Sequence, residues 1–379
     1  MQTADTPQPR LVGDTNWDGL HRPRIYYAIA ATFCGLFLSV LDGSICNVAL
    51  PSMAAQLGVP SEDSIWIVNA FQLAVMMLLL PFASLGELFG YKRVYVSGIV
   101  VFSAGSLLCA LAPSFAALVV ARTVQGVGAA MLMSVNTSLV KLIYPKRHLG
   151  EGVGLNATVV AIASVAGPAL SAAILSAGPW PWLFAINVPI GIVTFAMARK
   201  YLPDNPVRVL GRRFNIREAV LNAATFGLFI GCVEAYSHDA PAPAVLGGAA
   251  LMLAVGFAYV RMQRKEQYPM LPLDLLRIPI FTTSVATSVI SFTAQMLVMV
   301  GMPFMLSHTF GLGAVGIELL MVSWPVAIVF VAPLAGWLIS RVHPGILGGV
   351  GLALMCAGCF MLSSADAATG HAGLVGRLM

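Results

Sequence analysis

The chain has 379 residues, of which 58% are hydrophobic and only 10% are charged, and its formal net charge is +5. Soluble domains carry about 25% charged residues, so a soluble fold with this composition could not cover its surface. Apolar runs of about 20 residues, long enough to cross a hydrocarbon core of about 30 Å, recur along the chain. We therefore predict an all-α integral membrane protein, embedded in a lipid bilayer.

The N-terminal segment 1–24 is polar, contains three prolines and lacks the short apolar core of a signal peptide. We expect it to be a disordered cytoplasmic tail. After it, breaks at charges, prolines and glycines divide the chain into eleven expected membrane-spanning helices. Their approximate ranges are 25–50, 63–85, 93–112, 115–140, 152–177, 181–200, 216–236, 243–262, 279–305, 313–339 and 345–364.

The basic residues are distributed unevenly between the two ends of these helices. With the N-terminus inside, the tail and the cytoplasmic loops hold 19 of the 21 lysines and arginines, and the opposite loops hold none. The two exceptions are Arg122, within a helix, and Arg377, near the end of the chain. This separation follows the positive-inside rule and predicts a plasma-membrane protein with a cytoplasmic N-terminus. It explains the net charge without a nucleic-acid partner, which would need these charges on one folded face.

Asp42 lies within the first apolar run, in the stretch LDGSICNVALP that ends at Pro51. A carboxylate at the bilayer centre costs about 2.5–3.5 kcal/mol, so it usually faces a cavity or a partner. Asp42 lies about 14 Å from the expected helix end at Pro51, and Arg122 about 11 Å from the expected start of the fourth helix, so their depths are similar. Two interpretations remain open: a fixed ion pair that joins two helices, or a proton site whose occupancy changes with the cavity.

Three further stretches combine polar and small residues. In ARTVQGVGAA (121–130), Gln125 shares a helix face with Arg122, and the small residues that follow permit close approach of another helix. In the fifth expected helix, Gly167 and Pro168 interrupt the backbone hydrogen bonds and predict a bend. Between the second and third helices, an acid and two bases surround a glycine and predict a cytoplasmic latch between the helices, formed by Glu87, Gly90, Lys92 and Arg93.

These stretches resemble the signatures of the major facilitator superfamily, in particular its fourteen-helix drug:proton antiporter branch. The first-helix signature LDxTIVNVALP is similar to LDGSICNVALP, with Asp42, Asn47 and Pro51 in place. The signature RxxQGxGAA matches the stretch that begins at Arg122, and the antiporter GP signature matches Gly167-Pro168. The stretch WPWLFAINVPIG (180–191) is similar to WxWxFxINxPxG.

The loop signature GxLaDrxGrK of the same family matches only in part. Glu87 stands for its acid, but Ala83 replaces the first glycine and Leu88 the arginine. A second copy of this signature, APLAGWLISRVHPG, retains Arg341 but has Ser340 where the acid is expected. The second latch therefore lacks its carboxylate.

The resemblance implies six helices, two linking helices and six more. The chain would then consist of the cytoplasmic tail 1–24, a six-helix bundle at 25–202, two linking helices with basic flanks at 203–265, and an incomplete bundle at 266–379. This last part holds three helices and the start of a fourth. About eleven of fourteen expected helices are thus present, and we expect a C-terminally truncated chain.

The function implied by the resemblance is proton-coupled export of hydrophobic or cationic drug-like compounds, driven by the proton gradient and without a cofactor. Helices one and four would line the central cavity, where Asp42 would carry the proton or contact a cation and Arg122 would tune it. Further candidates for the coupling site or the cavity are Gln125, Asn47, Gln72, Asn136 and Glu318.

Two alternatives remain open at this point. The protein could export one specific metabolite or antibiotic, because cavity motifs do not specify the cargo. The incomplete second bundle also fits a truncated, non-transporting remnant or a partner subunit of a transporter. We do not expect an enzyme or a metal site, since no nucleophile–base pair, phosphate loop or cluster of metal ligands occurs in the sequence.

Overall fold

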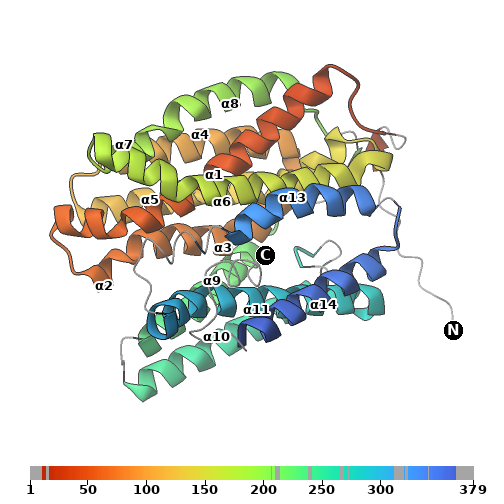
Figure 1. Ribbon diagram of the computed structural model, residues 1–379. Helices are drawn as coiled ribbons and strands as arrows, with labels where there is room; N and C mark the ends of the chain where they lie inside the picture. The colour runs from red at the N-terminus through yellow and green to blue at the C-terminus, as the bar shows by residue number, and fades with distance from the viewer. Residues whose placement is uncertain are drawn as a thin grey trace. The chain divides into compact units, whose positions relative to one another are not determined.

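The computed structural model has the predicted all-α architecture, with one short two-stranded ribbon (Figure 1). It describes residues 11–13, 17–205, 207–209, 214–237, 241–264, 266, 269–271, 273–310, 320, 323–339 and 341–363. The first helices along the chain are α1 (Arg24–Leu57), α2 (Ser61–Ser64), α3 (Trp66–Phe89), α4 (Tyr91–Ala110), α5 (Phe115–Ile143), α6 (Leu149–Ala177), α7 (Pro181–Ala185) and α8 (Asn187–Tyr201). They are followed by α9 (Ile216–Ser237), α10 (Ala242–Gln263), α11 (Pro279–Phe310), α13 (Ser323–Leu338) and α14 (Pro344–Ser363).

Each of the eleven expected spans overlaps at least one of these helices. Within the described residues, eight helical segments are long and apolar enough to cross a membrane, and two shorter apolar helices, Val326–Leu338 and Gly345–Met361, follow them. The chain divides into two compact units, which we describe separately. Unit 1 comprises residues 1–146 and 167–272, and unit 2 comprises residues 147–166 and 273–379, so the boundary lies within α6.

Local sequence explains where the helices of unit 1 begin and end. We expected α1 to end before Pro51, but it continues through this proline to Leu57 and is capped by Gly58, whose φ of 65° is left-handed. A proline removes one backbone donor without ending a helix that is held by its neighbours, whereas a glycine readily adopts φ > 0. Gly90, with φ of 103°, separates α3 from α4. Ser114 caps α5 by accepting a hydrogen bond from the Ala117 amide at 3.3 Å.

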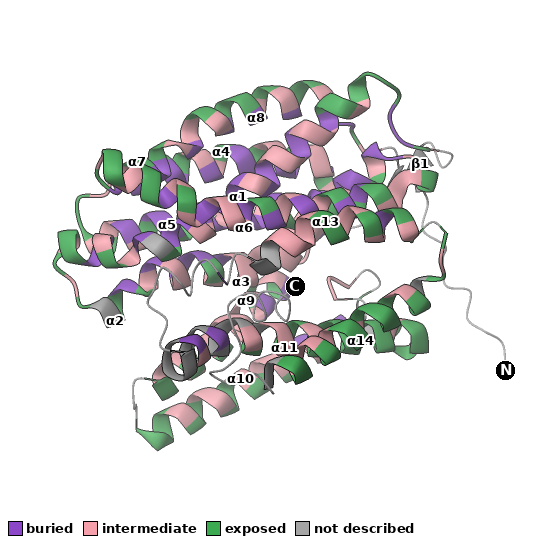
Figure 2. Cartoon of the chain, viewed as in Figure 1, coloured by how far each residue is buried: buried purple, intermediate pink, exposed green. Residues whose placement is uncertain are grey.

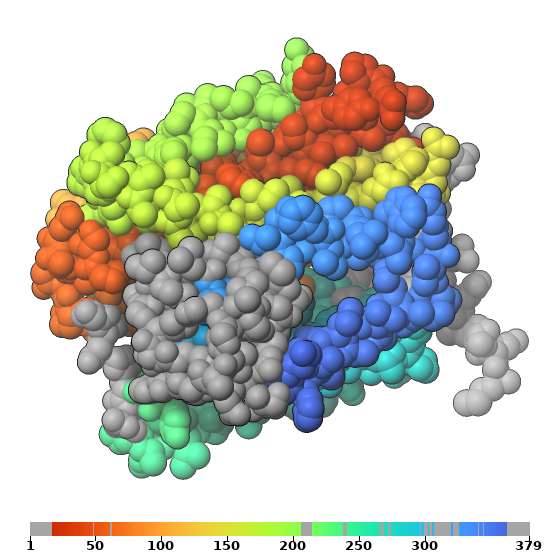
Figure 3. All heavy atoms as spheres, viewed as in Figure 1, coloured from red at the N-terminus to blue at the C-terminus, as the bar shows by residue number. Residues whose placement is uncertain are grey.

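Glycines on α5 allow close helix packing in unit 1, as the sequence predicted. A Cβ atom at Gly128 would lie 2.3 Å from the amide nitrogen of Phe102 on α4. One at Gly126 would lie 2.6 Å from the carbonyl oxygen of Phe71 on α3. Figure 2 shows the buried residues concentrated along α1, α4 and α5. The outer surfaces of α1 and α8 lie side by side (Figure 3).

The segment 17–23 is not the free tail that we expected. The Trp17 indole donates to the carbonyl of Leu142 at 2.9 Å, and the Leu20 amide donates to the carbonyl of Ile143 at 3.0 Å. These carbonyls lie in the last turn of α5, where they have no partner within the helix. The polar composition of the segment concealed this capping role. Before it, strand β1 (Leu11–Gly13) pairs antiparallel with β2 (Val207–Val209).

Helices α9 and α10 lie in the segment 203–265, where we expected two linking helices, and they are far less buried than α5. Only 6% of the most apolar window of each is buried, compared with 50% for α5. The two helices pack against each other, and α9 also packs on α3, where the Asn222 amide donates to the Met77 carbonyl at 2.9 Å. Their exposed surface is largely apolar, as expected for helices that face lipid.

In unit 2, the first half of α6 packs closely on α13. A Cβ atom at Gly150 would lie 2.7 Å from the carbonyl oxygen of Gly336, and one at Gly154 would lie 3.1 Å from the Cα atom of Gly336. Small residues at both surfaces thus bring the two backbones together without a large side chain between them. This is the packing that a stripe of small residues permits within a membrane.

Candidate functional site

Asp42 of α1 and Arg122 of α5 form a buried ion pair. Arg122 Nη1 lies 2.5 Å from Asp42 Oδ2. Asp42 is 2% exposed and Arg122 is 0% exposed, so the pair is closed off from solvent. The similar depths of these residues in the sequence anticipated this proximity. Their functional role stays a prediction.

Two amide side chains complete the surroundings of the Asp42 carboxylate. Gln125, one helical turn after Arg122, donates from Nε2 to Asp42 Oδ1 at 2.7 Å. Asn187, the first residue of α8, donates from Nδ2 to the same oxygen at 2.8 Å. Both carboxylate oxygens therefore have strong donors, supplied by two helices other than α1. We call the set Asp42, Arg122, Gln125 and Asn187 the carboxylate cluster.

A second layer of hydrogen bonds positions the cluster. Ser106 of α4 accepts from Gln125 Nε2 at 2.9 Å and donates to the Phe102 carbonyl at 2.9 Å. Arg122 Nη1 also donates to Gln125 Oε1 at 2.6 Å, and Arg122 Nε donates to the Ile67 carbonyl of α3 at 2.9 Å. These bonds fix the side chains on α5 relative to α3 and α4.

Two aromatic rings cover the Arg122 guanidinium. Its Cζ atom lies 4.4 Å from the ring centroid of Phe71 on α3 and 5.5 Å from that of Phe184 on α7. Cations attract the faces of aromatic rings, and this attraction is stronger away from water. The rings therefore stabilise the charge of Arg122 where hydration is absent.

Loss of either charge in the carboxylate cluster should strongly reduce the stability of the protein. Removing one partner of a buried ion pair typically costs about 3–5 kcal/mol, because the other charge is left uncompensated. Within the described residues, Arg122 Nη2 and Asn187 Oδ1 are buried and make no hydrogen bond. Besides the groups that hold Asp42, the cluster therefore contains one donor, Arg122 Nη2, and one acceptor, Asn187 Oδ1, that could bind a further group.

The GP pair of α6 lies against the helix turn that follows Asp42. A Cβ atom at Gly167 would lie 2.2 Å from Ser44 Oγ, so only glycine permits this approach of α6 to α1. One turn further on, the Ser171 hydroxyl donates to the Ile45 carbonyl at 3.3 Å. Pro168 lies inside α6, which continues through it. The pair thus contacts the part of α1 next to the candidate site.

The other cavity candidates do not join the carboxylate cluster. Asn47 and Gln72 are exposed on α1 and α3. Asn136 is buried, but it lies fourteen residues after Arg122 on α5, or about 21 Å along the helix. Glu318 lies outside the described residues. Among the described residues, no group of three or more His, Cys, Asp or Glu side chains is suited to hold a metal ion.

The predicted latch between α3 and α4 involves a segment that the sequence did not reveal. Lys92 Nζ lies 3.9 Å from Asp204 Oδ2, just after α8. The Tyr91 amide donates to Asn205 Oδ1 at 2.9 Å, and Asn205 Nδ2 donates to the carbonyl of Gly86 at 3.3 Å. The segment after α8 therefore holds the turn at Gly90.

The charged residues on either side of this turn are more exposed. Glu87 and Arg93 both lie at the surface. In unit 2, the exposed Arg341 places its guanidinium 3.5 Å from the ring centroid of Trp337. The residue in the position of the missing acid, Ser340, lies outside the described residues. The roles of these residues as latches stay predictions.

Sequence reasoning missed Asn187 and Ser106 as site residues. Asn187 lies in the stretch 180–191, which we matched to a family signature without assigning any of its residues to the site. Trp182 is 59% exposed, but Trp180 is 4% exposed and packs edge-on against Phe184 at 6.1 Å between ring centroids. A buried aromatic pair beside an asparagine was the signal that this stretch faces the protein interior.

The family model of the Major Facilitator Superfamily matches residues 32–376, which is most of the chain. The chain belongs to the major facilitator superfamily. The structure superposes with a TM-score of 0.65 on the proton:xylose symporter XylE at 12% identity, over 93% of this chain and 78% of XylE. This likeness shows the shared fold alone. As a member of the family, the protein is a multi-pass membrane transporter that binds a small substrate.

Several curated relatives are known by name. The uncharacterized transporter YebQ of Escherichia coli is 48% identical over 345 residues, covering 91% of this chain and 76% of YebQ. The riboflavin transporter RibZ of Clostridioides difficile is 31% identical, over 81% of this chain and 66% of RibZ. The tetracenomycin C resistance and export protein of Streptomyces glaucescens is 27% identical, over 98% of this chain and 69% of that protein.

Proposed function

We propose that this protein is a proton-coupled efflux transporter of the fourteen-helix antiporter branch, which exports hydrophobic or cationic drug-like compounds. The observation that carries the proposal is the buried carboxylate cluster, in which Asp42 of α1 pairs with Arg122 of α5 at 2.5 Å. A carboxylate inside a membrane helix is costly and typically marks a proton or substrate pathway. The GP pair of α6, which contacts the helix turn after Asp42, adds to the support.

The geometry suggests how a proton and a conformational change could be coupled. Ionised Asp42 holds α1 to α5 through Arg122 and Gln125, and to α8 through Asn187. A proton on Asp42 would neutralise the carboxylate and weaken its attraction to Arg122. The intact cluster would therefore require ionised Asp42. When Asp42 takes up a proton, α1 would separate from α5.

The proposal also includes the orientation of the chain in the membrane and its location in the cell. The turn at Gly90 and the ends of α5 and α8 each carry basic residues, which would place these ends in the cytoplasm by the positive-inside rule. The N-terminus would then be cytoplasmic, and the transporter would lie in the plasma membrane of a bacterium. The arrangement of two bundles at 25–202 and 266–379 around linking helices at 203–265 also belongs to this proposal.

The relatives support export but leave the cargo open. One is named for resistance to and export of tetracenomycin C, and another, Stp of Mycobacterium tuberculosis, is named a multidrug resistance protein and is 27% identical. RibZ, by contrast, is named a riboflavin transporter. That name favours a second candidate function, the transport of one specific metabolite.

Transport in proteoliposomes tests the proposal. With an imposed pH gradient, wild-type protein should move hydrophobic cations such as ethidium, and Asp42→Asn should abolish this movement. The matched control is Asp63→Asn, which makes the same chemical change at an exposed residue of α2 and should transport normally. Unchanged coupled transport by Asp42→Asn would disprove the coupling role. Movement of riboflavin but not of any cation in the panel would favour the second candidate function.

A further inference from the structure

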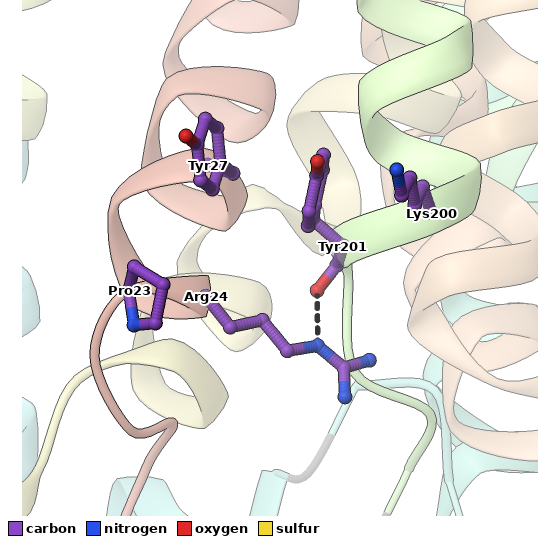
Figure 4. A pocket seen from close by; sticks show the side chains of 5 residues that line it. All are labelled: Pro23, Arg24, Tyr27, Lys200 and Tyr201. Atoms are coloured by element: carbon purple, nitrogen blue, oxygen red, sulfur yellow. Dashed lines mark hydrogen bonds between the residues drawn. The ribbon is translucent and has the colours of Figure 1, made fainter.

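A pocket of about 470 Å³ lies at one end of α1 and α8, away from the carboxylate cluster (Figure 4). Its lining residues are Pro23, Arg24, Tyr27, Lys200 and Tyr201. They come from the first turn of α1 and the last turn of α8, both of which belong to unit 1. The proposed transport function makes no use of this pocket.

The pocket has a fixed wall and a positioned cation. The rings of Tyr27 and Tyr201 stack with centroids 4.6 Å apart and an interplanar angle of 20°. Arg24 donates from Nε to the Tyr201 carbonyl at 3.1 Å, and Figure 4 shows its two terminal nitrogens directed away from that carbonyl. One hydrogen bond therefore orients the guanidinium and leaves its bidentate edge available.

The charge of the lining residues selects an anion. Arg24 and Lys200 are both basic, and none of the described lining residues is acidic. Lys200 Nζ lies 5.2 Å from the ring centroid of Tyr201, which keeps it on the pocket wall. Nearby, Arg22 lies over the ring of Tyr26 at 5.7 Å and extends the positive surface along α1. A planar guanidinium and an ammonium group together suit the oxygens of a phosphate group.

The position of the pocket indicates where the phosphate comes from. Arg24 and Tyr201 are the end residues of two candidate membrane spans, so the pocket lies at the level of the lipid headgroups. Tyr26 and Tyr27 are 55% and 47% exposed, as is typical of aromatic residues at a membrane interface. Two turns into the membrane, α8 exposes the apolar side chains of Ile192 and Val193, which offer a surface for acyl chains.

We propose that this pocket binds the phosphate headgroup of an anionic phospholipid. Arg24 contacts the phosphate oxygens with its terminal nitrogens, Lys200 contributes the second charge, and the stacked tyrosines form the wall beside the glycerol. The acyl chains extend along the apolar surface of α8. The lipid thereby joins the first turn of α1 to the last turn of α8, the two helices that carry Asp42 and Asn187.

Native mass spectrometry of the full chain tests this proposal, with phosphatidylglycerol and phosphatidylcholine as probes. Wild-type protein should retain phosphatidylglycerol in preference to phosphatidylcholine. Each basic side chain near a membrane surface contributes about five-fold to the binding of anionic lipid, so Arg24→Gln/Lys200→Gln should weaken phosphatidylglycerol binding about 30-fold. The control Arg199→Gln/Arg217→Gln removes two exposed charges that do not line the pocket and should weaken phosphatidylglycerol binding much less than the pocket variant.

Replacing Arg24 could disturb the structure, because Arg24 also holds the end of α8 through its hydrogen bond. The single variant Lys200→Gln, which keeps this bond, is therefore measured as well. This single variant should weaken phosphatidylglycerol binding about five-fold. Equal losses in the pocket and control variants would overturn the proposal, because they would reflect net charge alone. Inorganic phosphate or glycerol 3-phosphate that displaces phosphatidylglycerol at matched concentration would also overturn it, because the pocket would then bind a soluble anion rather than a lipid.

Discussion

Among the described residues of unit 1, two carboxylates are buried, and they are held in different ways. Asp42 and Glu218 are each 2% exposed. Asp42 receives a charged partner, Arg122, at 2.5 Å, together with the amides of Gln125 and Asn187. Glu218, in the first turn of α9, receives only neutral donors within the described residues. These are Gln263 Nε2 of α10 at 2.9 Å and the amide of Met270 at 3.4 Å.

The difference supports Asp42, rather than Glu218, as the carboxylate of the proposed coupling. Neutral donors can hold a carboxylate and its uncharged amide analogue with similar geometry, so the Glu218 contacts serve to join α9 to α10. An arginine partner attracts a charged carboxylate more strongly than a neutral one, so in the proposed mechanism the Asp42 contacts would weaken on protonation. Changes at the two sites should therefore differ in size, and the four predictions below begin with the largest expected effect and end with the smallest.

Arg122→Gln should have the largest effect. It leaves Asp42 buried without its counter-charge and should lower the free energy of unfolding by about 3–5 kcal/mol, measured by thermal unfolding in detergent. The double variant Asp42→Asn/Arg122→Gln should recover most of this loss, because neither charge remains. A double variant no more stable than the single one would contradict the charge-pair account.

Gly105→Ala should disturb the cluster without changing any of its polar groups. The added Cβ atom would lie 2.6 Å from the Cα atom of Gln125, so α4 and α5 must separate at the residue that supports Asp42. Overpacking of this kind costs about 1–3 kcal/mol, and coupled transport should fall in the same variant. Gly247→Ala on α10 is the control, because its Cβ atom would meet nothing within 4 Å. Equal melting temperatures for the two variants would speak against the close packing.

Asn187→Ala removes one of the three donors to Asp42. A hydrogen bond to a charged group contributes about 1.5–3 kcal/mol, so the loss of stability should fall in this range and stay below that of Arg122→Gln. Asn187→Asp would be more damaging, because it places a second carboxylate beside the first. If Asn187→Ala were as stable as the wild type, this residue would not be a member of the cluster.

Glu218→Gln should have the smallest effect, at about 1 kcal/mol or less, because its partners can bond a neutral amide. Transport driven by a pH gradient should persist in this variant, in contrast to Asp42→Asn. The comparison between the two carboxylates would fail if Glu218→Gln abolished coupling, since Glu218 would then share the proposed role of Asp42.

The sequence predicted the spans and the similar depth of Asp42 and Arg122, because both can be counted along single apolar stretches. Hydrophobic length indicates a span, and the depth of Asp42 and Arg122 can be counted from the expected helix ends. Asn187 and Ser106 were missed because a polar residue in an apolar helix does not reveal which neighbour it faces. The same limit applies to Asp204 and Asn205, whose partners at Lys92 and Tyr91 lie more than 100 residues away in the chain.

Two local expectations failed for physical reasons that the sequence alone does not contain. A proline usually marks a helix end in a soluble protein, but α1 continues through Pro51 to Gly58. The segment 17–23 has the composition of a free tail, yet it caps the last turn of α5. In both places the tertiary contacts decide the structure, and composition does not record them.

Proton release on substrate binding is the most direct test of the role assigned to Asp42. Purified protein in weakly buffered detergent solution would be mixed with a transported cation, and a pH-indicator dye would report the protons set free. The account predicts release by the wild type and by Glu218→Gln, and none by Asp42→Asn that still binds the cation. Equal proton release from Asp42→Asn and the wild type would show that the proton is carried elsewhere and would contradict the account.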